Sequence, residues 1–95
     1  MKTSELTGIA LDWAVGTTGE YGVGFFSTDW AKGGPIIERE AIQITPDEYK
    51  GAWFAYTTNE GEAYEGTGPT PLIAAMRCYV ASKLGDDIDV PEELF

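Results

Sequence analysis

The sequence contains no histidine and a single cysteine, Cys78, and these two shortages exclude several classes of site. Histidine is the side chain used most often for acid–base catalysis and metal binding near neutral pH. Zinc sites and Cys–His or Ser–His–Asp catalysis are therefore excluded within the chain. One cysteine cannot form an internal disulfide, which fits a reducing, cytosolic setting. No catalytic residue, metal ligand or cofactor is predicted.

Basic residues are also scarce, because six lysines and arginines stand against sixteen acids, for a net charge of −10. Five of these acids lie in residues 86–95, which contain no basic residue. Direct binding to nucleic acid is not expected, since it requires lysine and arginine to neutralise phosphates. The acidity fits a solvated surface that keeps the protein soluble, or a surface that mimics nucleic acid toward a basic protein.

Long apolar runs are missing as well. No stretch approaches the roughly 20 apolar residues of a membrane span, and no basic leader precedes an apolar run. We therefore expect no membrane association. The chain has three Trp, five Tyr and four Phe, which can fill one small core without a disulfide. We predict a single domain over residues 1–85, followed by an acidic tail over residues 86–95.

The clearest structural pattern is the stretch GPTPLIAAMRCYVASKLG at Gly68–Gly85. Thr70 is suited to cap a helix, Pro71 suits its first position, and Gly85 suits its left-handed end. A helix over about 70–84 would be apolar around most of its circumference, which is typical of a buried, central helix. One of its faces carries the small side chains of Ala74, Cys78 and Ala81. We expect a sheet or helix to approach that face closely.

A first, short helix is predicted after Thr7, with Leu6 and Leu11 at the spacing of a hydrophobic staple. The sequence GTTG at residues 16–19 ends it. The side chains expected to face inward are those of Ile9, Trp13, Ala10 and Val15.

Residues 28–40 contain the second helix, but Gly33, Gly34 and Pro35 interrupt the pattern. Proline inside a helix removes a hydrogen bond and clashes with the carbonyl four residues back. The preferred prediction is therefore a turn over 28–33 and a helix from Pro35 to about Glu40. A continuous, kinked helix over 29–40 is the alternative.

The strands are predicted from alternation and β-prone residues at 41–45, 51–57 and 62–66, with turns at 46–48 and 58–61. Tyr21–Phe26 contains two glycines and fits either a short edge strand or an ordered loop. The order of elements indicates an α+β fold, in which a small antiparallel sheet of three to four short strands packs with three helices.

Two Asp–Trp pairs and the only two arginines are the candidate binding residues. They are Asp12, Trp13, Asp29, Trp30, Arg39 and Arg77. Each tryptophan fits either a core aromatic or an exposed binding platform. Each arginine fits either a structural ion pair or an anchor for an anionic ligand.

Two long blocks resemble the NinX-type family of small phage and prophage proteins of unknown function. They are STDWAKGGPIIEREAI at Ser27–Ile42 and GPTPLIAAMRCYVASKLGDDIDVPEEL at Gly68–Leu94. Leu6–Val15 and the strand around Trp53 match the same layout, which is similar to related phage α-β-α sandwich domains. The resemblance implies a phage or prophage origin and expression in the bacterial cytoplasm. It implies no catalytic residue.

The leading hypothesis is a non-enzymatic accessory protein that binds a host or phage macromolecule, with a protein as the expected partner. The alternative is a small-molecule pocket between the Trp30–Pro35 turn and the final helix, using Arg39 or Arg77. An enzyme working through carboxylates alone ranks third. A dimer is one way to cover apolar surface that such short helices leave open.

Overall fold

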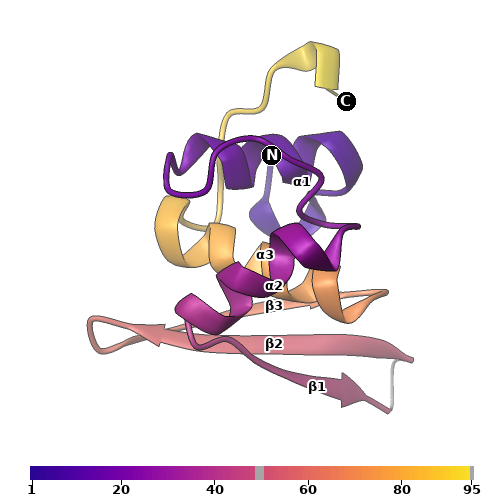
Figure 1. Cartoon of the computed structure of the whole chain (residues 1–95), viewed down its shortest axis with the longest axis vertical. Coiled ribbons are helices and arrows are strands. Elements are labelled where there is room, and N and C mark those ends of the chain that lie inside the picture. The colour runs from indigo at the N-terminus through magenta and orange to yellow at the C-terminus, as the bar shows by residue number, and fades with distance from the viewer. Residues whose placement is uncertain (49–50, 95) are drawn as a thin grey trace.

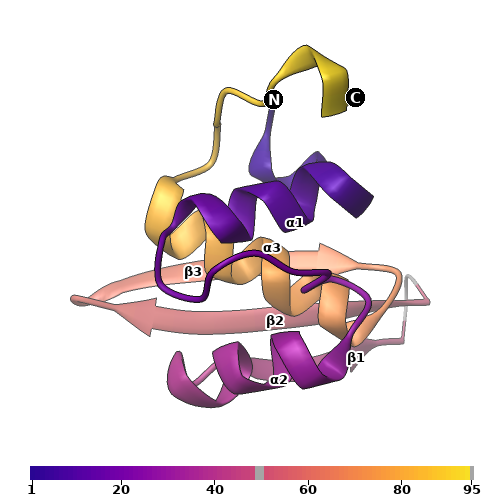
Figure 2. The same cartoon turned by 45° about the horizontal axis from the view of Figure 1, so that its top comes forward.

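The computed structural model describes residues 1–48 and 51–94. Within this part, the helices are α1 (Gly8–Thr17), α2 (Trp30–Arg39) and α3 (Pro71–Leu84), and the strands are β1 (Gln43–Asp47), β2 (Ala52–Asn59) and β3 (Glu62–Gly68). Two 3₁₀ turns, η1 (Thr3–Glu5) and η2 (Glu92–Leu94), flank them. The strands form one antiparallel sheet in the order β1-β2-β3. The helices lie on one face of this sheet, so the predicted α+β fold is confirmed (Figures 1 and 2).

Helix α3 lies directly on β2 and β3 and is the central element of the fold (Figure 2). Its small face approaches two glycines of β3. A Cβ on Gly66 would meet the carbonyl oxygen of Ala74 and lie 2.5 Å from the amide nitrogen of Cys78. A Cβ on Gly68 would lie 2.8 Å from Cγ2 of Ile73. The close approach predicted for the small face is confirmed.

Both ends of α3 form as the sequence predicts. The Thr70 hydroxyl oxygen accepts a hydrogen bond from the amide of Ile73 at 3.1 Å, and Gly85 has a φ of 88°. Between these ends, the side chains from Ala74 to Ala81 are all buried. The fully buried Tyr79 is the bulkiest side chain among them.

Helix α1 forms where it was predicted, but the expected inward orientation of Ile9 was wrong and that of Trp13 is confirmed only in part. Ala10, Leu11, Ala14 and Val15 face the core. Ile9 is 64% exposed, and Trp13 is only partly buried against the core. Residues four apart share one face of a helix, so burying Leu11 and Val15 leaves Ile9 in solvent and Trp13 at the edge of the core.

Helix α2 is continuous, so the preferred prediction of a turn before Pro35 was wrong and the alternative was right. The Asp29 carboxylate caps the helix by accepting from the amide of Ala31 at 2.9 Å. Gly34 carries no Cβ that could meet the ring of the following proline. Packing also holds the helix, because a Cβ on Gly33 would lie 2.5 Å from Cδ1 of Leu72.

The sheet confirms three predicted strands with shifted ends. The turn expected at 46–48 was wrong in part, because Pro46 and Asp47 pair with β2 in an edge strand, where proline is tolerated. The hairpin turn between β2 and β3 consists of Glu60 and Gly61, both at positive φ, as a type I′ turn requires. Tyr21–Phe26 forms no strand in the described chain and belongs to the ordered loop between α1 and α2.

The start of the predicted acidic tail lies beside the N-terminal residues (Figure 1). The amide of Thr3 donates to the carbonyl of Asp86 at 2.8 Å, and the amide of Ile88 donates to the carbonyl of Met1 at 3.0 Å. The Thr3 hydroxyl donates to the carbonyl of Gly85 at 2.6 Å. The division of the chain at Gly85 stays a prediction. None of the helices within the described residues has the length and apolar character needed to cross a membrane.

Replacing Gly66 by alanine tests the contact between α3 and β3. Backbone atoms of α3 already occupy the position of the added methyl group, so the helix must move away from the strand. We expect the free energy of unfolding in urea to fall by about 3 kcal/mol. Thr67→Ala is the matched control on the exposed side of the same strand, with an expected change of about 0.5 kcal/mol. Equal losses in the two variants would contradict the close contact.

Candidate functional site

The largest apolar hollow described on the surface is a groove of about 660 Å³ between α1 and the loop that follows it. We call it the α1 groove. Its lining residues are Ile9, Asp12, Trp13, Gly16, Thr17, Val23, Gly24, Phe25 and Leu94. Most of this lining is apolar, although the groove opens to solvent.

One wall of the α1 groove follows from helical periodicity. Ile9, Trp13 and Gly16 recur at a spacing of three or four residues, which places them on a single face of α1. Asp12 lies on the same face and fixes the opposite wall. Its Oδ1 accepts a hydrogen bond from the amide of Ser27 at 2.8 Å, which holds the loop beside the helix.

The loop supplies the second wall with two strongly exposed apolar side chains. Val23 is 93% exposed and Phe25 is 67% exposed. Sequence reasoning missed both residues as site candidates. A usable signal was present, because large apolar residues alternate with glycine in a stretch too weak to form a strand.

The C-terminal turn η2 closes one end of the α1 groove. Leu94 lines the groove, whereas Glu92 and Glu93 of the same turn are exposed. Asp12 is the only charged side chain of the described lining. The aliphatic part of the Lys32 side chain also lies beside the groove, because a Cβ on the lining residue Gly24 would be 3.4 Å from Lys32 Cδ.

The structure brings Asp12 and Trp13 together in the α1 groove but disperses the other candidates. Asp29 serves as the cap of α2, and Trp30 is 54% exposed at the first position of that helix. The guanidinium of Arg39 lies 5.4 Å from the ring centroid of Tyr21. None of these three candidates lines any of the three described cavities.

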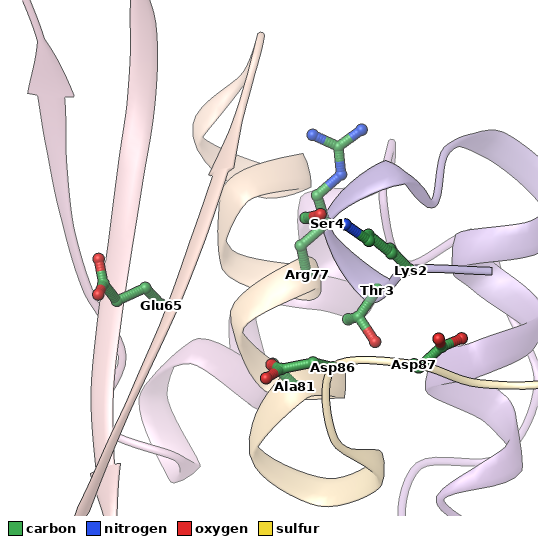
Figure 3. Close-up of a pocket in the computed structure, with 8 residues that line it drawn as sticks. All are labelled: Lys2, Thr3, Ser4, Glu65, Arg77, Ala81, Asp86 and Asp87. Carbon is green, nitrogen blue, oxygen red and sulfur yellow. The ribbon is translucent and has the colours of Figure 1, made fainter.

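Arg77 lines a second, smaller cavity of about 270 Å³ (Figure 3). Its Nε donates to the carbonyl of Leu6 at 2.8 Å, and its Nη1 donates to the carbonyl of Thr67 at 2.7 Å. The residue is 91% buried, and burial lowers the pKa of the guanidinium. In the described chain, no carboxylate lies within 4.0 Å of it. Lys2 and Asp86 line the same cavity.

A polar cluster joins the loop after α1 to the ends of α2 and α3. The Tyr21 hydroxyl donates to Glu40 Oε2 at 3.0 Å, and the Tyr79 hydroxyl lies 3.1 Å from Glu20 Oε2. Lys83 Nζ lies 3.3 Å from Glu40 Oε1 and 3.7 Å from Glu20 Oε1. Burial and the hydrogen bond to Glu40 raise the pKa of Tyr21 to about 12. This cluster positions the loop that carries the second wall of the groove.

Cys78 is not an available nucleophile in the folded protein. Its thiol is fully buried and donates to the carbonyl of Tyr64 at 3.4 Å. Burial, with a contribution from the charge of Glu65, raises the pKa of the thiol to about 12. The thiolate needed for nucleophilic attack is therefore not formed near neutral pH.

A model of the family described as bacteriophage P22 NinX matches residues 26–83, which is more than half of the chain. The chain belongs to the NinX family. The resemblance noted for α2 and α3 is confirmed, and membership makes the chain a phage accessory protein. Among curated proteins, none matches the chain.

The NinX match divides the candidate residues into two groups. Asp29, Trp30, Arg39 and Arg77 lie within residues 26–83, together with the sheet and most of α3. Every residue that lines the α1 groove lies outside that range. The groove is therefore built by the segments that flank the NinX match.

Raising the pH tests the polar cluster of this NinX protein. Tyr21 ionises near pH 10.0 in the unfolded chain but only near 12 in the folded one. The stability that comes from the raised pKa of Tyr21 is therefore fully present below pH 10 and is lost as the pH rises toward 12. We expect the free energy of unfolding in urea to fall over this range, and to fall less steeply in Tyr21→Phe. Equal slopes for the variant and the wild type would show that Tyr21 does not contribute.

Proposed function

We propose that this chain is a binding module of a phage or prophage that acts in the bacterial cytoplasm. Its α1 groove takes an apolar segment, flanked by lysine or arginine, of a partner protein from the host or the phage. The supporting observation is the concentration of exposed apolar side chains, Ile9, Val23 and Phe25, around one hollow.

Exposed apolar side chains are common singly but mark interaction sites when they gather around a groove. Here they come from two segments, α1 and the loop, that a hydrogen bond from Ser27 to Asp12 holds together. A pre-formed groove spares the partner the entropy cost of ordering it. Aromatic residues such as Trp13 and Phe25 are frequent anchors of binding energy at interfaces.

The negative charge of the protein favours basic residues on either side of the partner's apolar segment. The chain carries a net charge of −10, Asp12 lines the groove, and Glu92 and Glu93 are exposed in the same turn as the lining residue Leu94. A basic segment is attracted by this excess of negative charge, and its approach is accelerated at low salt. An acidic segment of equal apolarity is repelled.

Leu94 supports a leucine-like anchor as the apolar part of the partner. Its side chain, presented from the short turn η2, already lines the groove beside the exposed apolar residues. The remaining volume of about 660 Å³ leaves room for further side chains. The small-molecule alternative near Trp30–Pro35 stays a prediction, since residues 30–35 line none of the three described cavities.

The test uses a dye-labelled amphipathic peptide of about 12 residues, built from leucine and lysine, the length at which helices become marginally stable. We expect measurable binding by fluorescence anisotropy, weakened by added salt. Phe25→Asp should lower the affinity about tenfold or more. Charge attraction alone predicts the opposite, because this variant is more acidic.

Two controls make this experiment decisive. Trp30→Ala removes another exposed aromatic side chain, 54% exposed against 67% for Phe25, that lies outside the groove, and it should leave the affinity unchanged. A peptide with glutamate in place of every lysine should bind far more weakly than the basic peptide. The proposal fails if Phe25→Asp binds like the wild type, or if the acidic peptide binds as tightly as the basic one.

A further inference from the structure

The cavity beside Arg77 contains charges of both signs that do not pair with one another. Arg77 and Lys2 line it together with Asp86, Asp87 and Glu65. Asp87 pairs with the N-terminal ammonium at 3.1 Å. Within the described residues, Arg77, Lys2, Asp86 and Glu65 take part in no ion pair. Figure 3 shows the Arg77 guanidinium and the Asp86 carboxylate on opposite sides of the Thr3 side chain.

Within the described residues, the buried guanidinium of Arg77 has no counter-ion, although a buried charge is stabilised by a counter-ion more than an exposed charge is. A buried charge costs free energy unless another charge or several hydrogen bonds compensate for it. The two carbonyl partners, of Leu6 and Thr67, use the Nε donor and one Nη1 donor. A guanidinium has five N–H donors in a planar fork, so an oxyanion can still be bound by those on the outer side.

The carboxylate of Asp86, on the acidic side of the cavity, is also accessible to a ligand. The backbone of Asp86 is fixed by the hydrogen bond from the amide of Thr3, whereas its carboxylate is exposed. A simple anion bound at Arg77 would be attracted by Lys2 but repelled by this carboxylate, by Glu65 and by the net charge of −10. A ligand that also carries a cationic group avoids this repulsion.

We propose that this cavity binds a small zwitterion, whose carboxylate is held by Arg77 and whose ammonium group is held by Asp86. A volume of about 270 Å³ admits a molecule of amino-acid size. This volume lies just below the range of about 300–1,000 Å³ that is typical of pockets for drug-sized ligands. The site is independent of the α1 groove, with which it shares no lining residue.

The experiment compares γ-aminobutyrate with butyrate and butylamine, each of which lacks one of its two charges. Binding to the full chain is followed by NMR through the Nε–H resonance of Arg77, which is held by the carbonyl of Leu6. Glycine and ε-aminocaproate vary the distance between the charges. We expect at least one zwitterion to shift this resonance at about 10 mM, in the range of weak small-ligand affinities. Butyrate and butylamine should bind at least about fivefold more weakly than this zwitterion.

Asp86→Asn separates the two halves of the site without touching Arg77. The side chain of Asp86 is exposed, so the substitution should not affect folding. The affinity of the variant for the zwitterion should fall to the affinity of the wild type for butyrate. Asp89→Asn is the charge-matched control outside the cavity and should bind like the wild type. The inference is overturned if no zwitterion shifts the Arg77 resonance. It is also overturned if butyrate binds as well as the zwitterions, or if both variants behave alike.

Discussion

The fold depends on the contact between α3 and β3, where glycines of the strand let the backbone of the helix and the side chain of Ile73 approach closely. Gly66 leaves room for the turn of α3 that carries Ala74 and Cys78, and Gly68 does the same near Ile73. At such short separations many weak dispersion contacts act together along the helix. With the sheet on this side, α1 and α2 cover other faces of α3. A chain of this size can thus bury one helix almost completely, which explains why that helix is apolar nearly all round.

Arg77 is the exception in that helix, and its position explains why a charged residue is tolerated there. Its guanidinium reaches from α3 to the carbonyls of Leu6 and Thr67, so one side chain connects the segment before α1, the end of β3 and the central helix. A shorter polar residue could not reach both carbonyls, and an apolar residue would leave them without these donors. The same reach places the charge at the edge of a cavity bordered by the paired terminal segments.

The parts of the fold that depend on interactions between neighbouring residues, such as helix ends, could be predicted from the sequence. Thr70, Pro71 and Gly85 define α3 because capping and left-handed geometry depend on neighbouring residues. Pro35 misled the prediction because packing at Gly33 and the absence of a Cβ at Gly34 outweigh one lost hydrogen bond. Ile9 misled it because α1 has apolar residues on both faces, and only the position of α3 decides which face is buried. The groove could not be foreseen, since it arises where α1 meets a loop without regular structure.

The NinX match and the α1 groove occupy complementary parts of the chain. Residues 26–83 supply α2, the sheet and nearly all of α3, whereas the groove is formed by α1, the loop before Phe26 and the C-terminal turn. Loops and flanking segments carried on a rigid scaffold are where binding residues are most often found. Asp12 joins the two parts, because its carboxylate on α1 holds the amide of Ser27 at the start of the NinX match. The scaffold therefore fixes where the exposed wall of α1 lies, and the binding proposed for the groove rests on residues outside the NinX match.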